Sequence, residues 1–430
     1  MGYEYATALV IAFFLVCLVM SVPVFVAMGL SAMVGAFALG GESVLQDAAL
    51  NAYDALNKFV LLAVPLYILA GTLLQETGLS KRLFTFASVL VAGIRGGLGV
   101  ATVIASAIFA AISGSSVATA ATIGLVAIPV LTSNNYPLGR SGALVAAGGT
   151  LGILIPPSIA LLLYGILTDQ SIGALFVAGV VPGIALALLM AIYTVIINPR
   201  DPNVTKPSAT DILKATVDAG PILLLPVLIF FGIYSGLATA TEVAALAVVY
   251  TLVIGFASRT LDLKKMYRAG LSASRASVMI FMLVAFGALM THFLTVTRIP
   301  QMLTELIAAS GLGFFGTITV MILFYVVLGM FLEALSMMLI TIPILYPVAM
   351  AIGMHPLAFG IFVVLAIEIA QITPPVGINL FTVSQIGKVP FESMIKATIP
   401  YVVMAILMMY GLAYWQEIAT WLPETMDYRQ

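Results

Sequence analysis

Long apolar segments recur along almost the whole of this chain, and they restrict its fold more than any other feature. Clear examples are residues 59–74, 222–237, 243–257 and 401–412. Their lengths approach the roughly 20 residues that cross the hydrocarbon core of a bilayer. Charged residues make up 8% of the 430 positions, whereas a soluble domain carries about 25%. A soluble fold would leave much of this apolar surface in water, so the sequence predicts a polytopic membrane protein.

The membrane-spanning segments are expected to be α-helices. Lipid offers no partners to free backbone groups, and the sequence lacks the short alternating strands of a membrane barrel. The net charge of −1 argues against a nucleic-acid partner. The single cysteine, Cys17, excludes a disulfide framework and a cysteine-based metal cluster. The predicted fold class is therefore an all-α polytopic protein that lies in the lipid bilayer.

Basic residues indicate which loops face the cytoplasm. By the positive-inside rule these are the segments around residues 81–82, 140, 200–214, 259–268 and 388–396. The acidic stretch 42–54 and the C-terminal tail are expected outside. No lysine or arginine precedes the first apolar stretch, so a cleaved signal peptide is not expected. Residues 5–39 would form one long tilted helix or two short helices broken near Pro23, and the lack of basic residues ahead of Lys58 favours two.

Proline positions reveal an internal repeat. Prolines of the first half recur in the second half at a constant offset of 218 residues, in the pairs Pro129 with Pro347, Pro156 with Pro374, Pro157 with Pro375 and Pro182 with Pro400. The loop after the first double proline has no basic residue, whereas its counterpart carries Lys388, so the two loops are expected on opposite sides. Inverted repeats of this kind build a midplane site in alternating-access transporters. Duplication for packing economy alone is the alternative.

The repeat and the charge pattern divide the chain into six parts. They are N-terminal scaffold helices (1–57), a first inverted repeat (58–197), a cytoplasmic linker (198–220), central scaffold helices (221–270), a second inverted repeat (271–416) and a periplasmic C-terminal tail (417–430). The first repeat is expected to contain a scaffold helix, an arm helix, a hairpin, a broken helix and a closing helix. The second is expected to contain a hairpin, a broken helix and a closing helix.

Each half contains two segments that cannot remain helical throughout. In the first half these are the serine and glycine cluster 113–116 and the double proline at Pro156. Proline removes backbone donors and displaces the preceding residue from the α region, which frees carbonyl groups. Broken backbone at membrane depth is tolerated where it is buried in protein or lines a watery cavity. Freed carbonyls and serine hydroxyls suit a small cation such as sodium, and helix ends add dipoles for a cation and an anion.

The second half repeats this arrangement in the segments 329–338 and 368–379, and adds two carboxylates. Glu333 and Glu368 lie inside apolar sequence, where an ionisable residue has a function, reaches a membrane interface or pairs within the bundle. Clusters of small residues also allow helices to pack closely. Their recurrence beside the proline pairs of both halves favours a binding site.

The paired motifs resemble those of a known family. ISGSSVATA with GGTLGILIPPS, and LGMFLEALSMM with ITPPVGINLF, are similar to motifs of the large membrane subunit of tripartite ATP-independent periplasmic (TRAP) transporters, and the resemblance covers nearly the whole chain. It implies an elevator-type transporter in the bacterial inner membrane, with two re-entrant helical hairpins, two broken helices and coupling to sodium ions. It also implies a small four-helix membrane subunit, expected as a separate polypeptide, and a soluble periplasmic substrate-binding protein.

The resemblance also implies site residues, which are carried over by motif. The first sodium site would use Ser113, Ser116, Gly152, Ile155 and Pro156. The second would use Gly329, Ala370, Thr373 and Val376. The substrate would lie between the hairpin tips, where the hydroxyl and amide donors are Ser115, Ser336 and Asn379.

The function implied is sodium-coupled uptake of a carboxylated organic solute of the C4-dicarboxylate or sialic acid class. A stand-alone sodium and organic-anion symporter and a passive channel are the alternatives. An intramembrane enzyme would need a base beside Ser113, or a histidine and carboxylate set at chelating spacing, and the sequence has neither.

Overall fold

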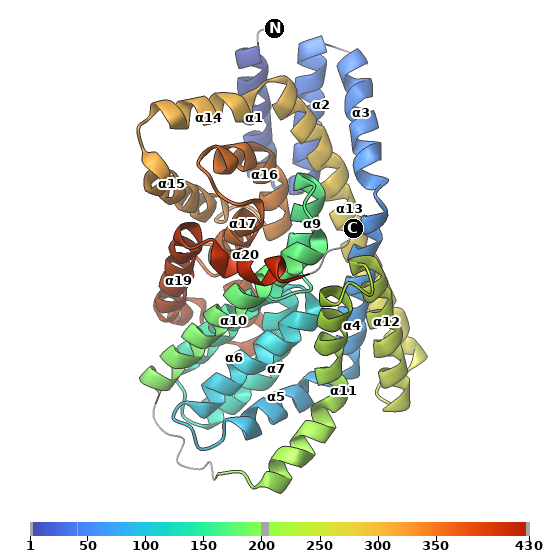
Figure 1. The fold of residues 1–430 in the computed structure, drawn as a ribbon, viewed down its shortest axis with the longest axis vertical. Helices are drawn as coiled ribbons and strands as arrows, with labels where there is room; N and C mark the ends of the chain where they lie inside the picture. Colours follow the sequence, from blue (N-terminus) through green and yellow to red (C-terminus); the bar gives the residue numbers. More distant parts are fainter. Residues whose placement is uncertain (1–2, 41, 199–205, 427–430) are drawn as a thin grey trace.

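The computed structural model describes residues 3–40, 42–198 and 206–426, and within these ranges it contains helices and no strands (Figure 1). Nine helical stretches of the described residues are long and apolar enough to cross a membrane. The prediction of an all-α polytopic protein is therefore confirmed for the described part of the chain.

The N-terminal part forms three helices, α1 (Tyr3–Val19), α2 (Val24–Gly40) and α3 (Glu42–Leu56). Ser21 adopts a left-handed φ of 59°, and Pro23 follows it before α2 begins. Helices α1 and α2 then lie side by side, and α2 packs against α13 (Leu263–Val296) and α3 (Figure 1). Residues 5–39 thus form two short helices, because the chain turns where proline cannot continue the first one.

The remaining helices follow one another in two similar series. The first series is η1 (Phe59–Leu62), α4 (Ala63–Thr77), α5 (Ser80–Leu90), α6 (Gly97–Ser113), α7 (Ser116–Ser133), α8 (Leu138–Leu154), α9 (Ile159–Thr168) and α10 (Ile172–Ile197). After α11 (Ala209–Tyr234) and α12 (Ala240–Ala257), the second is α13, α14 (Ile299–Ala309), α15 (Gly313–Leu328), α16 (Ala334–Ala351), α17 (Pro356–Gln371), α18 (Ile378–Gly387) and α19 (Phe391–Tyr414), before α20 (Glu417–Glu424).

Equivalent helices of the two series begin at nearly the same offset as the prolines. Helices α7 and α16 begin 218 residues apart, at Ser116 and Ala334, and so do α8 and α17, at Leu138 and Pro356. The two proline pairs occupy the gaps between α8 and α9 and between α17 and α18, and both Pro–Pro peptide bonds are cis. The sequence repeat is therefore also a repeat of helices.

Two helices extend across boundaries that were expected from the sequence. Helix α11 begins at Ala209, inside the segment 198–220 expected as a linker, because Ser208 and Asp211 form a reciprocal capping box. Helix α13 runs unbroken through the boundary expected at residues 270 and 271 over its 34 residues. It begins where the Asp262 carboxylate accepts a hydrogen bond from the backbone of Lys265 at 2.7 Å. Polar side chains outside the apolar runs thus set where these helices start.

The two broken helices lie at the centre of the molecule. Every residue from Leu357 to Gln371 in α17 is buried, as is every residue from Ser141 to Leu154 in α8. Each packs against the other and against helices of both halves. A helix that is apolar on all sides is stable only when it is surrounded. By contrast, α11 exposes Leu224, Val227 and Phe231, as expected of a lipid-facing surface.

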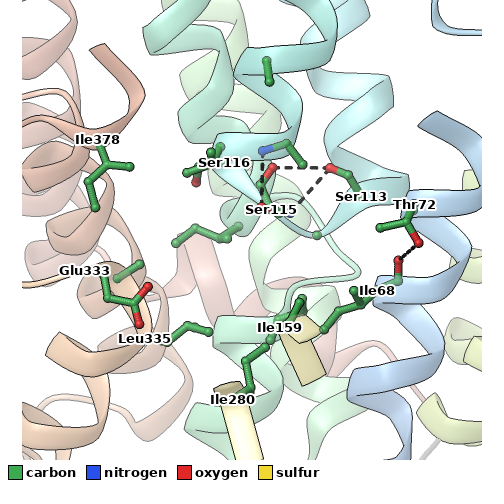
Figure 2. A pocket seen from close by; sticks show the side chains of 18 of the residues that line it. Ile68, Thr72, Ser113, Ser115, Ser116, Ile159, Ile280, Glu333, Leu335 and Ile378 are labelled. Atoms are coloured by element: carbon green, nitrogen blue, oxygen red, sulfur yellow. Dashed lines mark hydrogen bonds between the residues drawn. The ribbon is translucent and has the colours of Figure 1, made fainter. Parts of the chain in front are cut away.

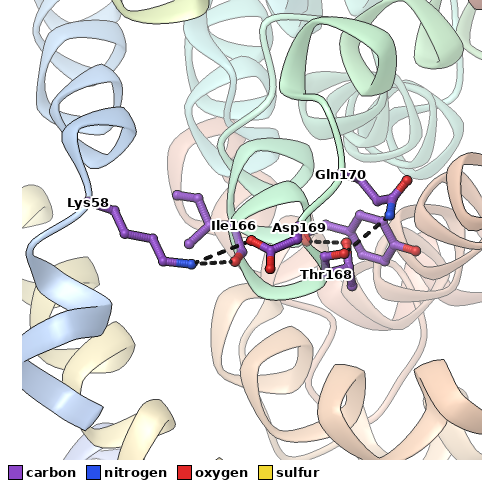
Figure 3. A network of polar contacts seen from close by, with 6 residues as sticks. Lys58, Ile166, Thr168, Asp169 and Gln170 are labelled. Atoms are coloured by element: carbon purple, nitrogen blue, oxygen red, sulfur yellow. Dashed lines mark hydrogen bonds and ion pairs between the residues drawn. The ribbon is translucent and has the colours of Figure 1, made fainter. Parts of the chain in front are cut away.

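Two ion pairs connect segments that are distant in sequence. The Lys58 ammonium donates to the carbonyl of Ile166 at 3.1 Å and lies 3.9 Å from the Asp169 carboxylate, which ties the start of the first repeat to the end of α9 (Figure 3). The Arg268 guanidinium lies 2.8 Å from the Glu76 carboxylate and joins α13 to α4. Exposed ion pairs contribute about 0–1 kcal/mol, so apolar packing supplies most of the stability.

Candidate functional site

A cavity of about 420 Å³ lies where the tips of the two halves approach each other. The first hairpin, α6 and α7 with the turn Gly114–Ser115, forms one wall (Figure 2). Glu333 and Leu335, at the connection between α15 and α16 where the second hairpin is expected, lie on the opposite side (Figure 2). Helices α4 and α13 close a third side, and residues of both broken helices complete the lining. The cavity therefore draws on both halves of the repeat.

The tip of the first hairpin is a two-residue turn that gathers polar groups. Helix α6 ends because Gly114 adopts a φ of 60°, a conformation that costs glycine little. Ser115 then caps α7, since its hydroxyl accepts the backbone N–H of Ala118 at 3.4 Å. The hydroxyl oxygens of Ser113 and Thr119 lie 2.8 Å apart across the turn. The serine-rich sequence thus becomes a compact turn with hydroxyls on its inner side.

The first broken helix packs directly against this turn. A β-carbon added at Gly152 would lie 2.5 Å from the carbonyl oxygen of Ser115 and 2.8 Å from the backbone nitrogen of Ser116. A β-carbon added at Gly114 would lie 2.9 Å from the carbonyl oxygen of Pro157. Contacts between backbones this close require glycine on one side. The structure therefore brings the serine turn, Gly152 and the proline pair together.

Two members of the first expected sodium set lie just beyond this contact. Ile155 is the residue at which α8 ends, and its side chain packs toward Gly183 of α10, where an added β-carbon would lie 2.7 Å from its Cγ1. Pro156 follows it and is partly buried.

The donor set at the first tip fits a small hard cation. The Ser113 hydroxyl and the carbonyl ends of α6 and α8 offer oxygen atoms with partial negative charge. The Ser116 hydroxyl donates to Oε1 of Glu368, whose side chain is 1% exposed. Oε2 of Glu368 has no hydrogen-bond partner among the described residues. A buried carboxyl group thus lies beside neutral oxygen ligands, and these oxygen atoms are of the kind that binds a small cation.

The connection between α15 and α16, expected as the tip of the second hairpin, is longer and spans residues 329–333. Gly329 ends α15 against α17, and a β-carbon added there would collide with the β-carbon of Ala370. The Thr373 hydroxyl donates to the carbonyl of Ile369 at 2.6 Å, at the end of α17. The structure therefore brings three of the four residues of the second expected set to one helix end.

The fourth residue of that set, Val376, lies on the far side of the proline pair. Its side chain is 45% exposed. Gly377 follows with a φ of 51°, and a β-carbon there would lie 3.2 Å from the carbonyl oxygen of Thr373. The chain therefore folds back at the proline pair, and Val376 can contribute through its backbone rather than through its side chain.

Of the three residues expected to contact substrate, Ser115 lines the cavity and the other two do not. Ser336 is 1% exposed, and its hydroxyl donates to the Glu333 carboxylate at 3.1 Å. Asn379 is fully buried, and its amide donates to the carbonyl of Ala146 on α8 at 3.4 Å. Glu333, whose role the sequence left open, is itself a lining residue.

Several polar lining residues were missed by sequence reasoning. They are Thr72 and Gln75 of α4, Thr122 of α7, Ser272 of α13 and Gln371 of α17. Most of them lie within continuous helices, away from the helix breaks that the sequence analysis singled out. The signal that could have found them is a polar residue within an apolar helix, such as Thr72 in the segment LAGTLLQET. The cavity is therefore partly built by helices outside the repeated hairpins and broken helices.

Helix ends of opposite polarity meet around the cavity. Helices α7, α9 and α18 begin at or beside its lining residues Ser116, Ile159 and Ile378, so their N-terminal N–H groups and positive dipole ends lie close to it. Helices α6 and α17 end beside its lining residues Ser113 and Gln371 and bring carbonyl groups. One region can therefore accommodate a cation and an anion at adjacent positions.

Comparison with known proteins agrees with this architecture. Residues 11–418 match the family model of the DctM component of tripartite ATP-independent periplasmic transporters. The chain is 36% identical to the C4-dicarboxylate TRAP transporter large permease protein DctM of Vibrio cholerae, over 97% of each chain. It is 33% identical to the sialic acid TRAP transporter large permease protein SiaM of the same organism, over 88% of this chain and 89% of the relative.

A third relative is longer than this chain. The isethionate TRAP transporter permease protein DctMQ of Oleidesulfovibrio alaskensis is 32% identical over 94% of this chain and 64% of the relative. Among solved structures, the YdaH transporter of Alcanivorax borkumensis aligns with a TM-score of 0.62 at 15% identity, over 97% of this chain and 99% of that one. MtrF of Neisseria gonorrhoeae aligns with a TM-score of 0.66 at 14% identity, over 96% and 97% of the chains, and these two likenesses show the fold alone.

The family assignment rests on the matching family model and on relatives that align over nearly the whole chain. The long apolar helices of the described residues agree with it. This chain is a multi-pass protein of the bacterial inner membrane, and it belongs to the DctM family, the large permease component of tripartite ATP-independent periplasmic transporters.

Proposed function

We propose that this chain takes up a carboxylated organic solute, of the C4-dicarboxylate or sialic acid class, together with sodium ions. The observation that carries the proposal is the first hairpin tip, where serine hydroxyls, carbonyl helix ends and the buried Glu368 carboxylate adjoin the cavity. Relatives named for C4-dicarboxylate and for sialic acid support the solute class. The volume of about 420 Å³ lies within the range of about 300–1,000 Å³ that holds small organic ligands.

The solute is proposed to bind between the two tips. The N-terminal ends of α7 and α9 would attract a carboxylate, and the hydroxyls of Ser115, Thr72 and Thr122 would supply donors. Sodium would bind on the carbonyl side of each tip, in the two residue sets around Gly152 and Gly329. A sodium ion bound there would also offset the negative partial charge of the carbonyl groups, and this would lower the electrostatic cost of bringing the solute carboxylate to the tip.

The movement is proposed to follow an elevator mechanism. The hairpins would be re-entrant, entering and leaving the membrane on one side, with the two halves inverted relative to each other. Sodium would order both tips over the solute, and the hairpins with the broken helices would then move against α4 and α13. These two helices pack against each other and are joined by the Arg268–Glu76 ion pair, which suits a fixed scaffold. Two sodium ions at −100 mV would supply roughly 4.6 kcal/mol, before the charge of the solute is subtracted.

Two partner proteins belong to the proposal. One is a small membrane subunit, and the other is a soluble periplasmic protein that delivers the solute. Relatives are named large permease proteins, and this chain covers 64% of the DctMQ relative, which supports a further membrane component. The solute specificity would then rest partly on the delivering protein.

Reconstitution tests the proposed function. Proteoliposomes that contain this chain and its small subunit should accumulate labelled succinate or sialic acid when the binding protein and an inward sodium gradient are both present. Replacing sodium with choline, or omitting the binding protein, should reduce uptake to that of empty liposomes, because the first change removes the driving ion gradient and the second removes delivery of the solute. Sodium-dependent uptake without the binding protein would instead support a stand-alone symporter. Uptake that needs neither would support a passive channel.

A further inference from the structure

Glu368 is a buried acid without a basic partner in the described part of the chain. The ion pairs within the described ranges join Lys58 to Asp169 and Arg268 to Glu76, and Glu368 takes part in neither. One carboxylate oxygen accepts the hydroxyl hydrogen of Ser116, and the other has no partner there. A buried charge with one hydroxyl donor and no counter-ion is costly. The carboxyl group is therefore either protonated or accompanied by a positive charge close by.

The position of Glu368 joins the two halves of the repeat. Ser116 begins α7 in the first hairpin, and Glu368 lies on α17 in the second broken helix, 252 residues away in sequence. Ser116 belongs to the residue set proposed for the first sodium ion. Ala370, two residues beyond Glu368, belongs to the set proposed for the second. The carboxylate thus contacts a member of the first set, and its helix α17 also carries a member of the second.

A further unpartnered oxygen lies on the second broken helix where it contacts α8. Oδ1 of Asn379, which is fully buried, has no partner among the described residues, while its amide contacts the carbonyl of Ala146 on α8. One turn further along α8, a β-carbon added at Gly149 would lie 3.0 Å from the carbonyl oxygen of Ser116. The second broken helix therefore contributes hydrogen-bond acceptors where α7 meets α8. The basic residues of the described ion pairs, Lys58 and Arg268, do not belong to this helix.

We propose that the Glu368 carboxylate supplies the negative charge that neutralises the cation at the first hairpin tip, and that it thereby makes sodium binding in the first half depend on the second broken helix. This inference rests on the proposed sodium coupling. A carboxylate that served packing alone would be replaceable by an amide of the same shape. A carboxylate that neutralises a cation would not be.

The test measures sodium binding directly in the purified full-length chain with its small subunit. Thermal stability is followed while sodium chloride replaces choline chloride at constant ionic strength. Glu368→Gln keeps the side-chain shape and the acceptor for Ser116 but removes the charge. Because a nearby opposite charge contributes strongly in a low-dielectric site, we expect its sodium midpoint to rise at least about tenfold. Its melting temperature in choline should stay equal to or above that of the wild type.

Two further variants complete the test. Ser106→Ala removes another buried hydroxyl without a partner, on α6 away from the tip, and its sodium midpoint should equal that of the wild type. Glu368→Asp retains the charge and should stay within about threefold of the wild type, because the Coulomb term survives a small shift in distance. If Glu368→Gln does not fold, Glu368→Asp decides, since a tenfold rise there would assign the effect to packing.

The outcomes separate this inference from the proposed function. An unchanged sodium midpoint in a folded Glu368→Gln variant would overturn the role of the charge while leaving sodium coupling in place. A wild-type complex with no sodium-dependent stabilisation and no sodium-dependent uptake would overturn the proposed function and this inference together.

Discussion

Alanine at position 152 is expected to reduce sodium-driven uptake by roughly 100-fold, near the upper end of the 1–3 kcal/mol that overpacking costs. The added methyl group would lie 2.5 Å from the carbonyl oxygen and 2.7 Å from the carbonyl carbon of Ser115. These are backbone atoms in a two-residue turn, and they cannot rotate away as a flexible side chain can. The first hairpin tip and α8 must therefore separate, which displaces the hydroxyls and carbonyls proposed to hold sodium.

Initial uptake rates in proteoliposomes and the sodium midpoint of thermal stabilisation measure this effect. Gly411→Ala is the matched control, because a β-carbon added at that position of α19 meets no atom within 4 Å. The control should transport as the wild type does and melt at the same or a higher temperature, since alanine favours a helix by about 1 kcal/mol over glycine. Wild-type uptake by Gly152→Ala would show that the close contact at the first tip is not needed for transport.

The second large effect is expected at the other tip, and a second substitution should restore most of the lost uptake. Gly329→Ala should lower uptake by roughly 10- to 100-fold, because its methyl group would collide with the β-carbon of Ala370. Gly329→Ala combined with Ala370→Gly should recover uptake to within about tenfold of the wild type, because the colliding carbon is removed while the Ala370 carbonyl position remains. Ala370→Gly alone should cost about 1 kcal/mol of stability through its lower helix propensity.

The double-mutant cycle is measured with the same uptake and thermal-stability assays. The informative quantity is the coupling between the two substitutions, which should be large and favourable. A double variant as defective as Gly329→Ala alone would show that the defect does not arise from contact with Ala370. The remaining neighbours of an added β-carbon, at 3.0 Å for Ala370 Cα and 3.2 Å for the Tyr325 carbonyl oxygen, set the limit of the rescue.

The two tips differ in ways that the motif symmetry did not reveal. The first hairpin turns within two residues, and the second needs residues 329–333. The Ser158 hydroxyl caps α9 and donates to the carbonyl of Ile153 at 2.5 Å, while its counterpart Val376 is exposed. Substitutions at equivalent positions are therefore expected to differ in size, with the tighter first tip the more sensitive.

The features predicted correctly from the sequence depend on properties of single residues and their immediate neighbours. Apolar segments of membrane length predicted an all-α polytopic protein, because lipid leaves backbone groups no partner outside a helix or barrel. Proline and glycine act on their own and neighbouring residues, so the breaks near Ser113, Pro156 and Pro374 and their constant offset were visible in the sequence. The serine turn and the close glycines followed from the same signals.

Side chains that meet across the fold could not be found in this way. Thr72 and Ser272 line the cavity from ordinary helices, and the carboxylate of Glu368 pairs with a serine 252 residues away. Burial and pairing depend on which helix faces pack together, and helix periodicity does not specify that choice in a chain that is apolar on nearly every face. The residue order thus accounts for the helices and their breaks, whereas three-dimensional packing accounts for the shape of the cavity and for the buried carboxyl group between the two halves.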